Sequence, residues 1–263
     1  MNFEEIIAIR EAFKTVKRRQ KANLPRDFNE KISRLREVRD FSVGNEELLK
    51  RAMEKIKANG INVITAKSGD DAIQTIIKEI KDEKIIIKSK SNVTKEIRLT
   101  EELESKGIKV VETDIGDRIL QVLKEKPSHP TGPISHLSAR RISQELSEIY
   151  GTQIKDSPED IVRFVRKEIR EYIEKSHTGI TGANAITAEE GSILLAHNEG
   201  NISEVIRKEK HFVVTAIDKV YPTIEDAINM LKVITYNATG SLIPSFVEII
   251  SGVSKTADVE KKF

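Results

Sequence analysis

KIIIKSKSNVTKEIRLTEELESKGIKVVET, residues 84–113, carries the pattern from which the fold is inferred. Short apolar runs at its two ends are typical of buried strands, and the Lys/Glu-rich segment between them is long enough for a helix. A helix is the usual connection between parallel strands, because a tight turn can join only antiparallel ones. We therefore predict a strand–helix–strand unit over these residues.

The same alternation continues on both sides of this unit. The segment INVITAK, residues 61–67, has the character of a strand, and residues 69–83 have helical spacing. The downstream pattern predicts helices at 115–125, 138–150, 158–175, 202–209 and 223–234, a strand at 211–217, and a short strand or helix after residue 243. Strands that alternate with helices in this way indicate an α/β fold with an open, mainly parallel sheet flanked by helices.

Residues 1–59 differ from the rest because their pattern is helical throughout. Apolar side chains recur every three or four residues in the first helix, and a second helix follows Pro25. A third helix begins at Asn45 and ends at the Asn59-Gly60 pair, a common C-terminal signal. We predict two units, an N-terminal helical extension at 1–59 and an α/β domain at 60–263.

The composition is that of a globular protein without a strong charge bias. Of 263 residues, 38% are hydrophobic and 33% charged, and the net charge is +2. This balance argues against nucleic acid as a partner, and the basic run KTVKRRQK at 14–21 lies on a helical pattern that favours a solvated face. The chain has no apolar run of about 18 residues, so we expect no membrane insertion and a cytoplasmic location. Frequent Ile, Lys and Glu are typical of a thermophilic source.

Cysteine is absent from the sequence. Its absence excludes disulfides, thiolate catalysis and cysteine-bound clusters or zinc from this polypeptide. The spacing of His129 and His136 matches no zinc-binding pattern, so we expect no metal site. Walker, dinucleotide-binding, nucleophile-elbow and HExxH motifs are also absent.

The first candidate site follows the strand in the opening stretch. Ligands of open α/β sheets bind beyond the carboxyl ends of the strands, and Lys88, Ser89, Lys90 and Ser91 lie at such an end, directly before a helix. Their cations and hydroxyls, with the free N–H groups of a helix start, would attract a carboxylate or phosphate. In the alternative interpretation, Ser91 caps the helix and the lysines are solvated.

The second candidate site is TGITGANAITAEEGSILLAHNEGN, residues 178–201, which is unusually rich in Gly and Asn. AITA and SILLAH predict a β-hairpin whose turn, Glu189-Glu190-Gly191, places Gly191 at positive φ. Small residues on both sides would let the backbone close on a ligand, although simple turns would also use them. The ligand-binding residues that we predict here are Gly182, Ala183, Asn184, Glu189, Gly191, Asn198, Gly200 and Asn201.

Four further residues complete the candidate site. Glu199 is predicted to be the catalytic carboxylate, because the residues around it are small and leave space. His129 lies in the Pro-rich loop KPSHPTGPISH and is predicted to line the same pocket. Ser254 and Lys255, in SGVSKTADVE, offer a hydroxyl and a cation to an anion.

Several of these motifs resemble, in the same order, the LUD domain family of lactate utilisation proteins. These motifs are KSKSNVTKEIRLTEELESKGIKVVETDIGDRILQ, PSHPTGPISH, TGANAITAEEGSILLAHNEGN, DKVYPTIEDA and SGVSKTADVE. The resemblance covers nearly the whole chain and is closest to the LUD portion of the family's B proteins. It implies a fold similar to the isomerase and CoA-transferase superfold. The B proteins continue into a ferredoxin-like module that this chain lacks, and they commonly have Thr at the position of Glu190.

The resemblance implies a subunit of an iron–sulfur L-lactate-oxidising complex. The clusters would lie only on partner subunits, and the pocket would bind a small anionic metabolite such as lactate. A non-covalently bound flavin, a homo-oligomer and catalysis by the chain alone stay open. The alternatives are a stand-alone isomerase- or CoA-transferase-like enzyme acting on a sugar phosphate or acyl thioester, with Glu199 as base or nucleophile, and a non-catalytic scaffold docked through the N-terminal helices.

Overall fold

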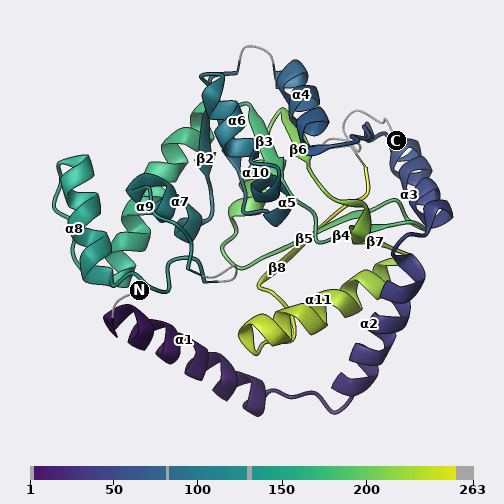
Figure 1. Ribbon diagram of the computed structural model, residues 1–263, viewed down its shortest axis with the longest axis horizontal. Coiled ribbons are helices and arrows are strands. Elements are labelled where there is room, and N and C mark those ends of the chain that lie inside the picture. The colour runs from purple at the N-terminus through teal and green to yellow at the C-terminus, as the bar shows by residue number, and fades with distance from the viewer. Residues whose placement is uncertain (1–2, 81–82, 129–131, 253–263) are drawn as a thin grey trace, which may run out of the picture.

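The computed structural model describes residues 3–80, 83–128 and 132–252, which form two four-stranded sheets surrounded by helices (Figure 1). The first sheet contains β1 (Ile85–Lys88), β2 (Lys109–Glu112), β3 (Thr178–Thr181) and β6 (Lys210–Val213), in the order β2-β1-β3-β6. Its three pairings are all parallel. The predicted α/β fold with a parallel sheet is confirmed.

The crossover between β1 and β2 consists of two helices, where the sequence predicts one. α5 (Asn92–Glu96) and α6 (Leu99–Ser105) are separated by Ile97 and Arg98, and the φ of 58° at Arg98 lies in the left-handed region. This residue redirects the chain, so that Leu99 and Leu103 are buried against the sheet while α5 begins at the end of β1. The Lys/Glu-rich pattern that predicts one helix here contains no signal for the break between α5 and α6.

Helices cover both faces of the first sheet. On one face, α4 (Gly69–Ile80) and α6 pack Ile73 and Leu103 against Ile86 and Val110. On the other face, α9 (Pro158–Lys175) and α10 (Asn201–Ile206) surround Ile87 and Val111. A further apolar cluster joins α9 to α7 (Ile115–Leu123) and α8 (Ala139–Tyr150), which lie at the left in Figure 1.

The second sheet is mixed and has the order β7-β4-β5-β8. It contains β4 (Ala185–Thr187), β5 (Ile193–His197), β7 (Val220–Tyr221), which follows the 3₁₀ helix η1 (Ile217–Lys219), and β8 (Phe246–Ile250). β4 and β5 pair antiparallel, so the predicted hairpin is confirmed, and Gly191 has the expected positive φ of 66°. β4 pairs parallel with β7, and β5 pairs antiparallel with β8.

The N-terminal helices α1 (Phe3–Ala22), α2 (Phe28–Ser42) and α3 (Glu46–Ala58) lie beside the second sheet and α11 (Ile224–Thr239). α2 packs Val38 against Tyr221 and Met230, and the rings of Phe28 and Tyr236 lie 4.4 Å apart. The predicted helical region is confirmed, whereas its boundary at residue 59 stays a prediction.

The observed strands differ from the predicted ones in three places. Residues 61–66 form no strand, although their side chains alternate, because β-prone residues need a neighbouring edge with which to pair. β3 and β7, in contrast, were not expected. β3 has the sequence TGIT, in which Gly179 is required because a Cβ there would collide with the carbonyl oxygen of Val205. A strand that contains one aliphatic side chain has no apolar run to predict it.

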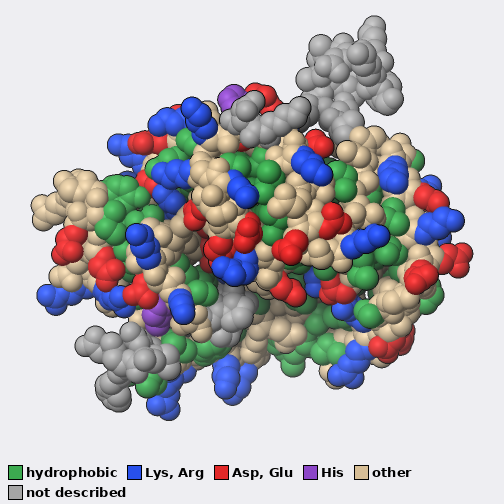
Figure 2. Space-filling model, turned by 45° about the horizontal axis from the view of Figure 1, so that its top comes forward, with side chains coloured by type: hydrophobic (Ala, Val, Ile, Leu, Met, Phe, Trp, Pro, Cys, Tyr) green, Lys and Arg blue, Asp and Glu red, His purple; other side chains and the backbone are tan. Residues whose placement is uncertain are grey.

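Charged side chains of both signs alternate across the face drawn in Figure 2, with hydrophobic side chains between them. This agrees with the small net charge of the chain. No helix in the described ranges combines the length and the apolar character that a membrane span requires.

Candidate functional site

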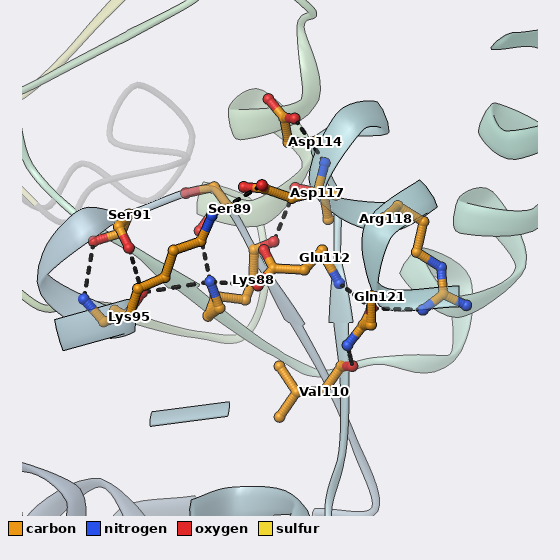
Figure 3. Close-up of polar contacts among 12 residues, drawn as sticks. Lys88, Ser89, Ser91, Lys95, Val110, Glu112, Asp114, Asp117, Arg118 and Gln121 are labelled. Atoms are coloured by element: carbon orange, nitrogen blue, oxygen red, sulfur yellow. Dashed lines mark hydrogen bonds and ion pairs between the residues drawn. The ribbon is translucent and has the colours of Figure 1, made fainter. Parts of the chain in front are cut away.

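The candidate site lies at the edge of the first sheet where β1, β2 and β3 end. Because these strands are parallel, the segments that follow Lys88, Glu112 and Thr181 start at the same edge. The side chains of Lys88, Lys95, Glu112 and Asp117 converge there from β1, α5, β2 and α7 (Figure 3).

A buried ion pair joins the ends of β1 and β2. The Lys88 Nζ atom lies 2.7 Å from Glu112 Oε1, and the Lys88 side chain is completely buried. Lys88 also donates to the Ser89 carbonyl oxygen at 3.3 Å and to Thr94 Oγ1 at 3.4 Å. Burial raises the pKa of Glu112, and the charge of Lys88 acts against this rise. The pair therefore places two compensating charges in the interior of the site.

A second ion pair lies beside the first. The Lys95 Nζ atom donates to Asp117 Oδ1 at 2.9 Å, and Asp117 is buried in the first turn of α7. The Asp117 carboxylate also contributes to the raised pKa of Glu112. The two pairs thus interact electrostatically.

Three buried oxygen atoms at this edge have no hydrogen-bond partner among the described residues. They are Ser89 Oγ, Glu112 Oε2 and Asp117 Oδ2. Buried polar atoms without partners are costly, and folded proteins contain few of them. Their concentration near the ends of β1 and β2 makes this edge the candidate functional site.

Gly182 brings the second candidate segment into contact with the first. A Cβ at Gly182 would lie 2.6 Å from Ser91 Oγ, so only glycine allows the end of β3 to approach Ser91 this closely. Ser91 caps α5, as expected, by accepting a hydrogen bond from Thr94 N at 3.3 Å. Lys90 directly precedes Ser91 in the chain and is partly exposed.

The loop after β5 reaches the same edge. Asn201 Nδ2 donates to Thr113 Oγ1 at 3.1 Å, and Thr113 Oγ1 donates to the Lys88 carbonyl oxygen at 3.2 Å. Glu199 Oε2 accepts a hydrogen bond from Ile115 N, the first residue of α7, at 3.0 Å. The Lys88–Ser91, Gly182 and Glu199–Asn201 segments are therefore brought together.

Glu199 lies in an environment that favours its protonated form. Burial raises the pKa of its carboxyl, and the nearby Asp114 carboxylate raises it further. The Ile115 N–H group, Arg166 and Lys90 act in the opposite direction. A carboxyl with a raised pKa can exchange a proton closer to neutral pH, as a general acid or base requires.

Other predicted residues occupy structural positions in the hairpin and its neighbours. Asn184 Oδ1 accepts from Ala196 N at 2.8 Å, and Asn198 Oδ1 accepts from Ser245 N at 2.9 Å. Ala183 packs in the apolar cluster of Ile193 and Leu195, and Gly200 precedes α10 with a φ of 78°. These contacts shape the loops around the site.

The Glu189–Gly191 turn is held by α3 and α11. Asn59 Nδ2 donates to the carbonyl oxygens of Glu190 and Gly191 at 2.8 and 3.1 Å, and Glu190 Oε1 accepts from Ile224 N at 3.2 Å. A Cβ at Gly191 would lie 2.6 Å from the Lys55 carbonyl carbon, so the backbone of α3 fills the space beside it. The glycine serves the packing of this turn on α3.

His129, Ser254 and Lys255 lie outside the described residues. The described part of the Pro-rich loop lies at the start of α7, where a Cβ on Gly116 would be 3.1 Å from Pro133 Cγ. His136, in the same loop, has a buried Nδ1 atom without a partner among the described residues.

Four residues of the candidate site were not predicted from the sequence: Lys95, Glu112, Thr113 and Asp117. Glu112 and Thr113 end the segment IKVVET in the same way as Lys88 and Ser89 end the segment KIIIKS. The same rule about strand ends would have selected them. Lys95 and Asp117 need the tertiary structure, because their side chains meet from two different helices.

The site offers buried hydrogen-bond acceptors, paired lysines and a carboxyl with a raised pKa. Such a set suits a polar metabolite that carries both an anionic group and hydroxyl groups. No cluster of three His, Asp or Glu residues suited to a metal ion occurs in the part of the chain that the structure describes.

Many small-molecule-binding proteins are α/β chains with a polar site at the carboxyl ends of parallel strands. The chain belongs to the LUD domain family, whose model matches residues 49–263. It is 34% identical over 219 residues to lactate utilization protein B of Bacillus pumilus, covering 81% of this chain and 46% of that protein. It is 32% identical over 229 residues to lactate utilization protein B of Oceanobacillus iheyensis, covering 85% and 48%.

A further relative is the uncharacterized electron transport protein YkgF of Escherichia coli, which is 32% identical over 231 residues, covering 86% of this chain and 49% of that protein. The chain thus spans about half the length of the curated relatives that it matches. No solved structure matches it significantly, so the resemblance to the isomerase and CoA-transferase superfold stays a prediction.

Proposed function

We propose that this protein takes part in lactate utilisation and that its strand-end site binds a small 2-hydroxy acid. The LUD family and the names of its B-protein relatives support the pathway. The single observation that carries the ligand class is the group of buried oxygens without partners, Ser89 Oγ, Glu112 Oε2 and Asp117 Oδ2. A ligand hydroxyl would give these acceptors a donor.

The carboxylate of the ligand needs a cation that is not already neutralised. Lys88 and Lys95 each have a carboxylate partner, whereas Lys90 forms no ion pair with the described residues. Lys90, the Ser91 region beside Gly182, and the Asn201 amide would therefore hold the carboxylate. The buried pairs beneath them would keep the interior polar without adding net charge.

Ligand binding is tested by calorimetric titration with L-lactate, glycolate, propionate, a phosphosugar and coenzyme A. We expect binding of lactate and glycolate and weaker binding of propionate, which lacks the hydroxyl. Lys90→Met should weaken lactate binding, whereas the same change at the exposed loop residue Lys155 should not. Binding of a phosphosugar without binding of either hydroxy acid would overturn the proposal.

Electron transfer from lactate would require other polypeptides. These 263 residues contain no cysteine, so they cannot supply the thiolates of an iron–sulfur cluster. We propose that the protein acts beside subunits that carry the clusters, which agrees with a relative being named an electron transport protein. Co-purification from the native host with an iron-containing partner, at a fixed ratio, would support this, and isolation of a lactate-oxidising activity without iron would contradict it.

A second function, catalysis by the chain alone, is favoured by Glu199. Its raised pKa and its place at the start of α7 suit a general base on a sugar phosphate or acyl thioester. Turnover by the purified chain, lost in Glu199→Gln, would establish this function. Equal turnover by the variant, or none by either protein, would exclude it.

A further inference from the structure

β8 is an edge strand of the second sheet, and its one pairing among the described residues is the antiparallel one with β5 (Figure 1). His197 ends β5 and lies opposite Phe246, the first residue of β8. Within β8, Ile250 belongs to an apolar cluster, whereas Val247 and Ile249 are exposed. Little apolar burial holds the start of β8, so its contact with His197 matters for how firmly this end is held.

The His197 ring is buried without a hydrogen-bond partner. Its side chain is 5% exposed, and neither Nδ1 nor Nε2 forms a hydrogen bond with the described residues. The ring stacks on that of Phe246, with centroids 5.0 Å apart and ring planes at 18°. Phe246 is itself 45% exposed, so its ring separates His197 from solvent. This setting favours the neutral imidazole, because a buried charge loses its hydration.

Glu248 of β8 is the charged group that acts on His197. Its Oε1 atom lies 3.6 Å from His197 Nε2, too far for a hydrogen bond, and accepts a hydrogen bond from Ser203 Oγ of α10. The charged residues of α10, Glu204 and Arg207, form an exposed pair with each other at 3.9 Å. Burial lowers the pKa of His197, and the Glu248 carboxylate acts against this. Burial therefore outweighs the attraction of Glu248, and protonation of His197 disfavours the buried arrangement.

The start of β8 also supports the loop between β5 and α10, which carries Glu199 to the candidate site. Ser245 N, directly before β8, donates to Asn198 Oδ1 in this loop at 2.9 Å. A Cβ at Gly200 would lie 3.8 Å from Phe246 Cζ, so the backbone on the other side of Glu199 packs against the Phe246 ring. Between these two contacts, the Glu199 carboxylate reaches the first residue of α7 at 3.0 Å. Movement of the start of β8 would therefore remove two supports of the Glu199 loop.

We propose that His197 and Phe246 form an acid-sensitive latch, which holds the start of β8 against the Glu199 loop while His197 is neutral and releases it when His197 is protonated. The imidazolium gains hydration by leaving the stack on Phe246. Because β8 is an edge strand, its start can move while the pairings of β4 with β5 and β7 stay in place. The latch would make the position of Glu199 depend on pH. It does not depend on lactate binding at the strand-end site.

The test follows the full chain by NMR between about pH 5 and pH 8, the range in which a His titrates. The His197 ring should titrate below 6.5, the usual pKa of a His. Amide hydrogen exchange, corrected for its intrinsic pH dependence, measures how often β8 opens. This opening should increase by about tenfold for each pH unit from 6.5 down to the pKa of His197, because the open state binds the proton more tightly. The amides of β4, on the other side of β5, should keep their protection.

His197→Gln should remove the pH dependence of β8 opening. The matched control is His177→Gln, which changes an exposed His paired with Glu209 at 2.8 Å and should leave this dependence intact. Phe246→Ala should hydrate the His197 ring and raise its pKa towards 6.5, so the opening becomes frequent and less dependent on pH. This variant tests the latch even if His197→Gln does not fold.

Four results would overturn the proposal. His197 could titrate at or above 6.5, or β8 of the wild type could open equally often at every pH. The pH-dependent opening could persist unchanged in His197→Gln. Finally, β4 and β8 could lose protection together as pH falls, which would show unfolding of the whole sheet instead of release of its edge strand.

Discussion

Lys88 and Glu112 are direct neighbours across two parallel strands, and their side chains form a buried ion pair of 2.7 Å. Both residues end their strands, so the pair lies at the edge of the sheet that forms the candidate site. A charge pair at this depth loses hydration and must be held by geometry. The contribution of the pair to folding stability can be measured, because removal of one charge leaves the other buried without a partner.

Lys88→Met should destabilise the protein by about 3–5 kcal/mol, because it leaves the Glu112 carboxylate buried without its cation. The added change Glu112→Leu should recover most of that loss, since it removes the unpaired charge. Urea unfolding of the two variants and the wild type measures the effect. A loss below about 1 kcal/mol in the single variant would show that Glu112 is neutral in the folded protein.

Glu199 should make stability depend on pH in a defined direction. Its pKa is raised above 4.5, so the folded protein holds the proton to a higher pH than the unfolded chain does. The contribution of Glu199 therefore decreases as pH rises from 4.5 through the raised pKa. Glu199→Gln keeps an acceptor for Ile115 N and removes the titration. Unfolding free energies measured across this window should show the wild type losing stability relative to the variant, and parallel curves would contradict the assignment.

Gly191→Ala should cost more than Gly107→Ala, although both residues have positive φ. An added Cβ at Gly107 meets open space, so the substitution costs only the left-handed conformation, about 1–2 kcal/mol. At Gly191 the Cβ would also lie 2.6 Å from the Lys55 carbonyl carbon. Thermal unfolding should therefore show a larger drop for Gly191→Ala. Equal drops would mean that α3 moves freely away from the turn.

Removal of α1 and removal of α2 should have different effects. A chain that begins at Pro25 keeps the contacts of Phe28 with Tyr236 and of Val38 with Met230, and we expect it to fold. A chain that begins at Asn45 loses these contacts and Arg34, which pairs with the buried Asp226 at 2.8 Å. We expect this shorter chain to unfold at a lower temperature and to bind a hydrophobic dye. Equal stability of the two chains would support a domain boundary at residue 59.

Part of this protein was predictable from local pattern alone. The alternation of IIIK and KVVE with helical segments predicts a parallel sheet, because side-chain periodicity is set by the backbone of each element. The Gly191 turn was predictable for the same reason, since positive φ favours glycine in any context. Sequence also located Lys88 and Ser91 at a strand end, the usual place for a ligand.

Other features depended on contacts between distant segments. β3 is a central strand with one aliphatic side chain. Gly179 within it and Gly182 directly after it are explained only by Val205 and Ser91, which pack against them. The pairing of Lys95 with Asp117 required two helices to meet. Only the tertiary structure decided which Gly/Asn segments reach the candidate site. A turn has the same local signal whether it lies at the ends of the strands, as near Asn201, or packs on a helix, as at Gly191.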